Sequence, residues 1–328
     1  MRILVTGIDG FVGSHMAEFL AGVPGAEVSG TSLVEPPYPN LRPDIPKLRI
    51  FQADLTESGR IYELFQDIRP ERVIHLAGQA FVPSAVQDPL ATMQANVIAG
   101  VHMLEAARSL REREGIDPRI LIVSSGEVYG ALEPERQPAT EDCILKPGNP
   151  YAASKASIDL IAQSYRRTYR MAVVVARPFN HAGPRQSPSF VTSSFARRFA
   201  ELSLGRGTPH LKVGNLHVRR DFTDVRDVVR AYWQMLELNA GDEAVFNVCS
   251  GVGHEIGGLV TLFQEITGIT VEVVRDENRV RSNEPPGVVG SSERLRRATG
   301  WVPTIPFEKT MRDVYFYWRD VLRLETAA

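Results

Sequence analysis

Three glycines recur at every third position directly after the first apolar run of the 328-residue chain. Gly7, Gly10 and Gly13 stand in the stretch TGIDGFVG, between a predicted strand, RILVTG, and a segment with helical periodicity, FVGSHMAEFLAG. Glycines allow the backbone to turn tightly and to approach a pyrophosphate, and a helix N-terminus offers free N–H groups with a partial positive charge. We therefore predict a dinucleotide-binding turn here. The alternative is a tight strand-to-helix turn without a ligand.

Apolar runs and helical periodicities alternate from this turn to about residue 178. The proline-rich segment 34–47 interrupts them and is predicted to be a surface loop. Strict alternation of strand and helix predicts an α/β fold, a Rossmann-type doubly wound parallel sheet. After the first strand and the first helix, the sequence predicts strands at 26–32, 48–55, 72–78, 119–125 and 172–178, and helices at 58–68, 88–110 and 149–169.

The alternation breaks up beyond Pro178, where loops such as NHAGPRQSPS and short strands such as HLKVG and AVFNVCS follow. This change predicts a smaller, irregular α/β lobe. We expect a dinucleotide-binding domain over residues 1–178 and a substrate lobe over 179–328, from which some segments return to the first domain. Ligands of open parallel sheets bind outside the carboxyl ends of the strands, so the loops there should carry the chemistry.

Composition argues against several classes of protein. The formal net charge is −2, which gives no electrostatic reason to bind nucleic acid or an anionic membrane. No run approaches the ~20 apolar residues that a membrane helix needs. Cys143 and Cys249 are far apart and form no CxxC pair, which argues against disulfides and fits a reducing cytoplasm. His75 and His181 are assigned structural roles, and no histidine pair has metal-ligand spacing, so no metal is expected.

Residues at the strand ends around the glycine turn are the candidates for cofactor binding. Thr31 and Ser32 end the second strand, where an acidic residue would bind the ribose hydroxyls and repel a 2′-phosphate. Small hydroxyl residues can accept that phosphate, so NADP(H) is favoured and NAD(H) is the alternative. Asp54, which closes the third strand, is predicted either to bind the adenine or to cap the next helix. The remaining predicted contacts are Phe11, Val12, Leu55, Leu76 and Ala77.

A tyrosine and a lysine lie four residues apart in YAASK, so that Tyr151 and Lys155 share one face of a predicted helix. The pKa of free tyrosine is about 10, and a lysine cation nearby is expected to lower it, which would make Tyr151 a usable acid or base. Ser125, at the end of the fifth strand, is predicted to hydrogen-bond the same substrate carbonyl oxygen. Tyr151 and Lys155 are also expected to contact the cofactor. The alternative for the pair alone is a surface aromatic residue beside a lysine.

The glycine turn, the serine and the YxxxK pair together resemble the extended short-chain dehydrogenase/reductase family of nucleotide-sugar epimerases, dehydratases and reductases. Within it the likeness is nearest to the GDP-6-deoxy-4-keto-mannose reductases, close to the GDP-mannose 4,6-dehydratases, and runs nearly the whole length of the chain. The segments that carry it are SSGEVYG, NPYAASKAS, VVVARPFNHAGPRQ, LKVGNLHVRRDFTDVRDVVRAYW, FNVCSG and GSSERLRRATGWVPTIP.

This resemblance implies that the C-terminal lobe binds the diphosphate and sugar of a GDP-sugar substrate. It also implies a homodimer formed through the helices predicted at 88–110 and 151–169, with a tetramer as the alternative; core packing would explain their apolar residues equally well. The guanidinium fork of arginine suits diphosphate oxygens, whereas the alternative for each charged residue is a surface salt bridge. The substrate contacts implied are Asn180, Arg185, Lys212, Arg220, Arg281 and Glu284.

The stretch SSGEVYG decides between two reactions. A 4,6-dehydratase needs a base, and usually a second polar group to assist loss of water, on this loop. Both Gly126 and Glu127 would lie against the sugar. Glu127 could be that base, but Gly126 has no side chain that could assist loss of water. A 4-keto reductase needs only Ser125, Tyr151 and Lys155, and leaves Glu127 a positional role.

We therefore predict NAD(P)H-dependent reduction of the C4 keto group of GDP-4-keto-6-deoxy-D-mannose to GDP-D-rhamnose. The alternative is a GDP-mannose 4,6-dehydratase or another nucleotide-sugar epimerase or dehydratase. A non-catalytic NAD(P)-binding protein on the same fold is disfavoured, because such a protein would be expected to lose the serine, the tyrosine or the lysine.

Overall fold

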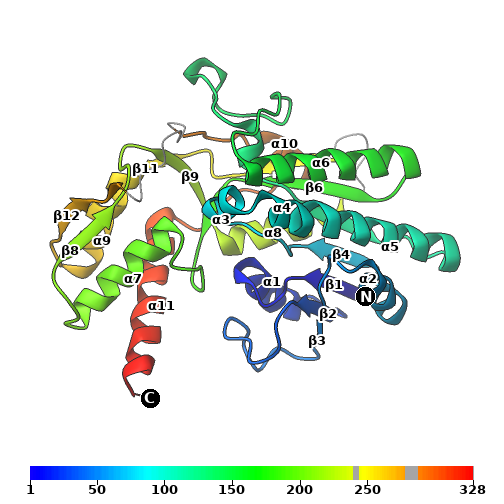
Figure 1. Cartoon of the computed structure of the whole chain (residues 1–328), viewed down its shortest axis with the longest axis horizontal. Helices are drawn as coiled ribbons and strands as arrows, with labels where there is room; N and C mark the ends of the chain where they lie inside the picture. Colours follow the sequence, from blue (N-terminus) through cyan, green and yellow to red (C-terminus); the bar gives the residue numbers. More distant parts are fainter. Residues whose placement is uncertain (239–243, 278–286, 328) are drawn as a thin grey trace.

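A parallel sheet of seven strands forms the centre of the computed structural model, which describes residues 1–238, 244–277 and 287–327 (Figure 1). Its strand order is β10-β6-β5-β4-β1-β2-β3, with every pairing parallel. This order confirms the predicted doubly wound α/β fold. The strands of this sheet are β1 (Arg2–Thr6), β2 (Glu27–Ser32), β3 (Arg49–Gln52), β4 (Arg72–His75), β5 (Arg119–Val123), β6 (Val173–Pro178) and β10 (Val245–Val248).

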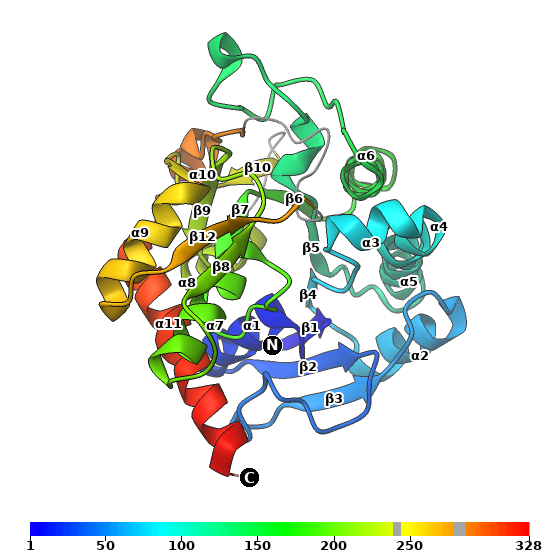
Figure 2. The ribbon, with the colours of Figure 1, turned by 60° about the vertical axis from the view of Figure 1, so that its left-hand side comes forward.

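The central strands are apolar because helices cover both faces of the sheet. Every residue of β6 is buried, and most residues of β1, β4 and β5 are too. Figure 2 shows α2, α5 and α6 on one side of the sheet, and α1 and α8 on the other. The helices are α1 (Phe11–Ala21), α2 (Ser58–Ile68), α3 (Val82–Gln87), α4 (Pro89–Met93), α5 (Ala99–Glu114), α6 (Pro150–Tyr169), α7 (Val191–Ser203), α8 (Val225–Glu237), α9 (Ile256–Thr267), α10 (Glu293–Thr299) and α11 (Phe307–Ala327).

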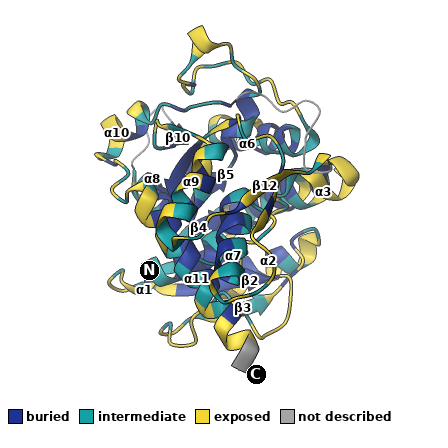
Figure 3. Ribbon diagram, turned by 90° about the vertical axis from the view of Figure 1, so that its left-hand side faces the viewer, coloured by how far each residue is buried: buried dark blue, intermediate teal, exposed yellow. Residues whose placement is uncertain are grey.

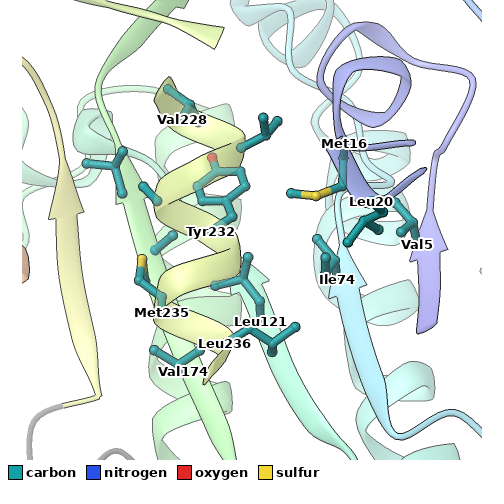
Figure 4. Close-up of a cluster of buried hydrophobic side chains, with 14 of the residues drawn as sticks. Val5, Met16, Leu20, Ile74, Leu121, Val174, Val228, Tyr232, Met235 and Leu236 are labelled. Atoms are coloured by element: carbon teal, nitrogen blue, oxygen red, sulfur yellow. The ribbon is translucent and has the colours of Figure 1, made fainter. Parts of the chain in front are cut away.

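Two hydrophobic clusters lie against the two faces of the sheet. On one face, Tyr232 and Met235 of α8 belong to the same cluster as Met16 and Leu20 of α1 (Figure 4). Burial of each such side chain stabilises the fold by about 1.5–3 kcal/mol relative to an exposed position. Figure 3 shows the buried residues concentrated along the strands and the inner faces of the helices. The loops at the strand ends, where the predicted site residues lie, are therefore supported by a buried core on each face of the sheet.

The helix predicted at 88–110 is confirmed, because residues 89–114 are helical without a break, and one turn within it is π-helical. Asp88 ends α3 and caps α4 by accepting the N–H of Ala91 at 2.9 Å. A residue before proline avoids the helical conformation, and the Asp88-Pro89 pair follows this rule. A π-helical turn, η1 (Gln94–Ile98), then separates α4 from α5. The predicted surface loop at 34–47 is confirmed, because these residues form neither helix nor strand and are mostly exposed.

A smaller lobe contains the remaining strands, which are β7 (Asn180–Ala182), β8 (His210–Val213), β9 (Arg219–Asp224), β11 (Gly253–Glu255) and β12 (Glu272–Arg275). They pair as β11-β9-β7 and as β12-β8, and α7, α9 and α11 pack on them around a third hydrophobic cluster. Short 3₁₀ turns, η2 (Gly126–Tyr129) and η3 (Pro134–Arg136), lie in the loop between β5 and α6.

Two segments beyond residue 178 return to the central sheet. The stretch AVFNVCS, predicted as a strand of the lobe, supplies β10, which pairs with β6 at the sheet edge. Helix α8 covers the face that α1 leaves open. The residues after Pro178 therefore contribute to the central sheet as well as to the smaller lobe.

Candidate active site

The carboxyl ends of β1 and β4 mark the point where the strand order reverses direction. Parallel α/β sheets bind ligands in the crevice outside such a point, because the loops on either side diverge there. The glycine turn follows β1, and Leu76 and Ala77 follow β4. The N–H groups of Leu76 and Ala77 both donate to Thr6 Oγ1 at 3.1 Å. This contact fixes the two strand ends beside each other.

The glycine turn leaves no room for a side chain at Gly7 or at Gly13. Gly7 has a φ of +65°, and a Cβ atom there would lie 3.0 Å from the Cα of Ala77. A Cβ atom at Gly13 would overlap the carbonyl oxygen of Gly7. Gly10 begins α1, and among the described residues no side chain caps that helix and no acidic residue lies in its first turn. The geometry therefore fits a pyrophosphate above the first turn, where Phe11 and Val12 lie.

The hydroxyl groups of Thr31 and Ser32 are engaged with the backbone. Thr31 is 2% exposed, and its Oγ1 accepts the N–H of Gly7 at 3.3 Å. Ser32 is 1% exposed, and its Oγ donates to the carbonyl oxygen of Val34 at 3.0 Å. The structure therefore does not support their predicted contact with a 2′-phosphate. The contact of these two residues with the cofactor stays a prediction.

Asp54 lies exposed beyond the end of β3, and its neighbour Leu55 is buried. One carboxylate oxygen, Oδ1, accepts both the N–H and the hydroxyl of Thr56, at 2.8 and 2.7 Å. This is a local turn of the kind expected from the capping alternative, although Glu57 is the residue that precedes α2. The contact of Asp54 with adenine stays a prediction.

His75 is a buried structural residue, as the sequence suggested. Thr6 Oγ1 accepts two N–H groups, so its own proton is donated to His75 Nδ1 at 2.9 Å. Burial lowers the pKa of His75 to about 3, with a further contribution from Lys155. The ring is therefore neutral and carries its proton on Nε2. His181 is held by the carbonyl oxygen of Phe179 at 3.0 Å, which fits its predicted role in shaping the loop.

Ser125, Tyr151 and Lys155 come together at the carboxyl ends of β5 and β6. Ser125 lies close enough to Tyr151 to lower the pKa of its phenol, and Ser125 Oγ accepts the N–H of Glu127 at 3.1 Å. Lys155 lies one turn further along α6 and donates from Nζ to the carbonyl oxygen of Val123 at 2.9 Å. Ser124 Oγ donates to the carbonyl oxygen of Lys155 at 3.1 Å, which fixes the helix against β5. The predicted triad therefore exists as one cluster.

The pKa of Tyr151 differs from the sequence-based expectation. Burial raises it to about 12, the hydrogen bond from Ser125 opposes this rise, and the charge of Glu127 adds to it. Lys155 does not offset the rise, because its ammonium group is directed at the backbone of β5 and burial lowers its own pKa to about 8. In this state Tyr151 is a protonated phenol at neutral pH, which is the form that donates a proton.

Glu127 lies beside Tyr151 and is oriented by Asn149, a residue that the sequence analysis did not assign. The side-chain Oδ1 of Asn149 caps α6 by accepting the N–H of Ala152 at 2.8 Å. This cap fixes the orientation of the amide, so that Nδ2 is directed at Glu127 Oε2, at 3.4 Å. The Asn-Pro pair before Tyr151 is a recognisable helix-start signal, but nothing in the sequence connects it with Glu127.

Asn96 connects the loop after β4 with the catalytic helix. It lies in the π-helical turn η1 and is 2% exposed. Its Oδ1 accepts the N–H of Gln79 at 2.7 Å, and its Nδ2 donates to Ser154 Oγ at 2.8 Å. Extra residues in a helical turn re-aim side chains in this way. The sequence pattern predicted a regular helix here and so missed this link.

The ring of Phe179 fills the space beside Gly126. A Cβ atom at Gly126 would lie 2.9 Å from Cγ and Cδ2 of this ring. Phe179 is 6% exposed, stacks on Tyr129 with ring centroids 6.2 Å apart, and also fills the space beside Gly290. The aromatic ring of Phe179 therefore occupies the volume into which a side chain at position 126 would extend.

Replacing Gly126 by alanine is expected to destabilise the protein by about 1–3 kcal/mol, because the added methyl group overpacks against Phe179. The double variant Gly126→Ala/Phe179→Leu should recover part of this loss, measured as the free energy of unfolding in urea. Gly148→Ala is the control, since a Cβ atom there meets nothing within 4 Å. Unchanged stability of Gly126→Ala would show that the ring moves aside freely.

The predicted substrate residues are distributed unevenly in the structure. Asn180 begins β7, and Arg220 lies on β9, to which β7 is paired. Lys212 lies on β8 and lines a cavity of about 660 Å³. Arg281 and Glu284 lie outside the described residues. The cavity lies between α7, β8 and β12, and its cationic lining includes Arg197 and Arg198.

Arg185 lies against α1. Its guanidinium forms a forked ion pair with Glu18 of α1, with Nη1 to Oε1 at 2.6 Å and Nη2 to Oε2 at 2.9 Å. The predicted contact of Arg185 with the substrate diphosphate therefore gains no support from the structure, which shows the salt bridge instead. Within the described residues no group of three or more histidines, cysteines, aspartates or glutamates could hold a metal ion. No described helix is long and apolar enough to cross a membrane.

Comparisons with known proteins agree with this geometry. The family described as GDP-mannose 4,6 dehydratase matches residues 4–314 of the chain. A GDP-6-deoxy-D-mannose reductase of Pseudomonas aeruginosa is 37% identical over 324 residues, which cover 99% of each chain. GDP-mannose 4,6 dehydratase 2 of Arabidopsis thaliana is 30% identical, over 94% of this chain and 84% of that protein.

Two solved structures have the same fold. The structure of RMD from Pseudomonas aeruginosa complexed with NADPH superposes with a TM-score of 0.84 at 35% identity, covering 98% of this chain and 100% of that one. UDP-glucose 4-epimerase of Thermotoga maritima with UDP-glucose superposes with a TM-score of 0.87 at 29% identity, with the same coverage.

Proposed function

Because the chain belongs to the GDP-mannose 4,6-dehydratase family, we propose that it reduces the C4 keto group of GDP-4-keto-6-deoxy-D-mannose with NADPH, giving GDP-D-rhamnose. The P. aeruginosa relative is named as a reductase of this kind, and the P. aeruginosa structure carries NADPH. NADH is the alternative cofactor, since other structures of this fold carry NAD.

The Gly126–Phe179 contact carries the choice of reaction. Loss of water from C6 is assisted by a polar group next to the base, and Phe179 fills the place where a side chain at Gly126 would lie. Reduction of a ketone has no such requirement. It needs a proton donor at the keto oxygen, and the raised pKa of Tyr151 keeps its phenol protonated.

The residues divide the reaction between them as follows. The bound cofactor supplies the hydride that C4 receives. Ser125 Oγ donates a hydrogen bond to the keto oxygen, which polarises the carbonyl group. Tyr151 transfers its phenolic proton to the same oxygen as negative charge develops there, and the resulting phenolate regains a proton from solvent. Lys155 would hold the cofactor ribose through its ammonium group, which in the structure donates to the carbonyl oxygen of Val123.

The glycine turn is the site for the cofactor pyrophosphate. Three positions without a Cβ atom, and a helix N-terminus without a capping side chain among the described residues, form a cradle for an anion. Gly7, Gly10 and Gly13 would hold the pyrophosphate through backbone N–H groups. The buried hydroxyls of Thr31 and Ser32 leave the 2′-phosphate to other groups near the end of β2.

The GDP moiety is proposed to bind in the C-terminal lobe. Lys212 lines the 660 Å³ cavity together with Arg197 and Arg198, both of which pair with Glu201 in the same lining. Asn180 and Arg220 lie on adjacent paired strands. Arg281 and Glu284 remain proposed contacts from outside the described residues.

A GDP-mannose 4,6-dehydratase is the second candidate, and the position of Glu127 favours it. Its carboxylate lies close enough to Tyr151 to raise the pKa of that phenol, and Asn149 orients it. A base at this place could remove the C5 proton. In the reductase, Glu127 instead binds a sugar hydroxyl.

The two functions are separated by incubation of the purified protein with two substrates. GDP-4-keto-6-deoxy-D-mannose with NADPH should be reduced, with one NADPH consumed for each keto sugar. GDP-mannose alone should remain unchanged. Formation of the keto sugar from GDP-mannose without net consumption of cofactor would establish the dehydratase instead.

The rate of reduction at saturating substrates is expected to fall as the pH rises through about 8, the value to which burial lowers the pKa of Lys155. Below this pH the ammonium group carries the charge with which Lys155 would hold the cofactor ribose. Tyr151 keeps its proton up to a pH of about 12, so its own titration does not cause the fall. The measurement is kcat between about pH 6 and pH 10, with Lys155→Arg as the control that stays charged. The same descending limb in Lys155→Arg would exclude Lys155 as the titrating group.

We also propose a homodimer formed through α4, η1 and α6. Leu90, Ile98 and Leu160 project large apolar side chains into solvent from these adjacent elements, and are 69%, 44% and 53% exposed. Burial in a symmetric interface would remove these groups from water. Sedimentation equilibrium measures the mass directly, and a monomer of 36.4 kDa would contradict the proposal. A tetramer would need a second interface.

The cytoplasm is the proposed location. Cys143 and Cys249 are both free thiols, and Cys249 is buried. Free thiols are typical of a reducing compartment. Localisation of a tagged full-length protein by cell fractionation tests this assignment.

A further inference from the structure

One stripe of α1 contacts a segment of the C-terminal lobe. Phe11, His15 and Glu18 are spaced so that they share a face of this helix. The ring of Phe11 stacks on that of His181, with centroids 6.0 Å apart, and His15 Nε2 donates to the carbonyl oxygen of Pro184 at 3.0 Å. Glu18 pairs with Arg185. Residues 181–185 therefore lie along the helix whose N-terminus forms the phosphate cradle.

Arg185 is the most extensively bonded residue of this contact. Besides its fork on Glu18, it donates from Nη2 to His15 Nδ1 at 2.8 Å. The nitrogen Nδ1 is free to accept, because His15 carries its proton on Nε2 and because burial and Arg185 lower the pKa of His15 to about 4. The side chain of Arg185 is only 12% exposed. The guanidinium is thus fixed in one orientation by two residues of α1.

The same guanidinium reaches a third segment. Nη1 donates to the backbone carbonyl oxygen of Asn40 at 3.1 Å, and the side chain of Asn40 donates to the carbonyl oxygen of Asp9 at 3.0 Å. Asp9 lies inside the glycine turn. Leu41 and Ile45, in the same loop, pack against the hydrophobic cluster on the α1 face. The loop 33–48 therefore runs from the end of β2 back to the phosphate cradle, and Arg185 and Asn40 hold it there.

This placement has a chemical meaning for a bound dinucleotide. In a doubly wound sheet the adenosine ribose lies at the end of β2, and the pyrophosphate lies at the turn after β1. A loop that is anchored at both places passes beside the adenosine half of the cofactor. If the loop is released from α1, it no longer lies beside the adenosine half. The loop must then become ordered when the cofactor binds, and this ordering lowers the affinity.

We propose that Arg185 is a positioning residue for the cofactor, which fastens the loop 33–48 to α1 and thereby sets the affinity for the adenosine half of the dinucleotide. This inference rests on the proposed cofactor site. It gives Arg185 a role other than binding the substrate diphosphate, and it identifies Asn40 as the other end of the fastening.

The test is a set of dissociation constants measured by titration calorimetry for NADPH, 2′-phospho-ADP-ribose and GDP. Arg185→Lys keeps a cation beside Glu18 but cannot reach Asn40 and His15 with a fork. We expect the Kd for NADPH and for 2′-phospho-ADP-ribose to rise by the same factor, about tenfold, while the Kd for GDP stays unchanged. Asn40→Ala should weaken the same two ligands.

Non-additivity separates this role from a general loss of stability. Once one end of the fastening is cut, cutting the other should matter little, so Arg185→Lys/Asn40→Ala should resemble either single variant. Arg72→Lys is the matched control, because Arg72 also pairs with a carboxylate, Glu237 at 2.7 Å, but at the amino end of β4. It should leave all three dissociation constants unchanged.

Three outcomes overturn the inference. The first is an Arg185→Lys variant that binds NADPH as the native protein does. The second is a weakened affinity for GDP with an unchanged affinity for NADPH, which would indicate that Arg185 binds the substrate diphosphate. The third is a loss for NADPH without a loss for 2′-phospho-ADP-ribose, which would place the effect at the nicotinamide end. Failure of the native protein to bind NADPH would instead contradict the proposed function itself.

Discussion

Replacement of Tyr151 by phenylalanine is expected to lower kcat for reduction of the keto sugar by about 10²- to 10⁴-fold, the range for loss of a general acid. The ring and its packing remain, while the phenol that lies beside Ser125 and that we propose as the proton donor disappears. The pKa of about 12 makes this donor fully protonated at neutral pH, so the native rate draws on the whole enzyme population. Initial rates of NADPH oxidation at saturating keto sugar measure the effect.

The control for this prediction lies on the same helix. Tyr165 of α6 donates its hydroxyl proton to Glu105 at 2.7 Å, about four helical turns from Tyr151. Tyr165→Phe removes one phenol oxygen in the same way and should leave kcat within about twofold of native, because its hydroxyl is distant from the reacting carbonyl. Turnover by Tyr151→Phe at the native rate would mean that another group protonates the product oxygen.

Replacement of Asp159 by alanine is expected to destabilise the protein by about 3–5 kcal/mol, because it leaves the Arg177 guanidinium buried without its carboxylate. The two side chains are 0% and 4% exposed, and Nε of Arg177 lies 2.7 Å from Oδ2 of Asp159. Arg177 also donates to Tyr129 and to the carbonyl oxygen of Glu141, both at 3.1 Å. The free energy of unfolding in urea measures the loss.

A double variant tests whether the uncompensated charge is the cause. Asp159→Ala/Arg177→Met removes both charges and should be more stable than Asp159→Ala alone. Glu293→Ala is the surface control, since it breaks an exposed pair with Arg296 and should not shift the unfolding transition measurably. A double variant less stable than the single one would show that the other bonds of Arg177 dominate.

The glycine turn and the common face of Tyr151 and Lys155 could be predicted from local sequence, because both depend on fixed spacing. Gly7, Gly10 and Gly13 must occur together for the backbone to turn, and a helix brings Tyr151 and Lys155 to one face whatever surrounds it. Ser125 follows an apolar strand, and parallel strands end at one edge of their sheet. Each of these inferences uses only the nearest few residues or the direction of a strand.

Contacts between distant segments could not be predicted in this way. The ring of Phe179 meets Gly126 across two strand ends, and Asn149 meets Glu127 across the start of a helix. The motif around Arg185 predicted a contact with the substrate diphosphate, but in the structure its guanidinium pairs with Glu18. The pKa of Tyr151 depended on where the Lys155 ammonium group points, which spacing alone does not determine.

Because α8 and β10 return to the central sheet, the sheet and the smaller lobe are connected by several passages of the chain and not by a single linker. The chain passes from the sheet to the lobe after β6, back at α8, out again after β10, and back at α10. Several covalent passages restrict the lobe to small displacements, so wide swinging about a single pivot is not available to it. A fragment cut after Pro178 would leave β6 as an unpaired edge and the hydrophobic cluster under α1 uncovered. The central sheet and its covering helices are thus complete only when the C-terminal part of the chain has been synthesised.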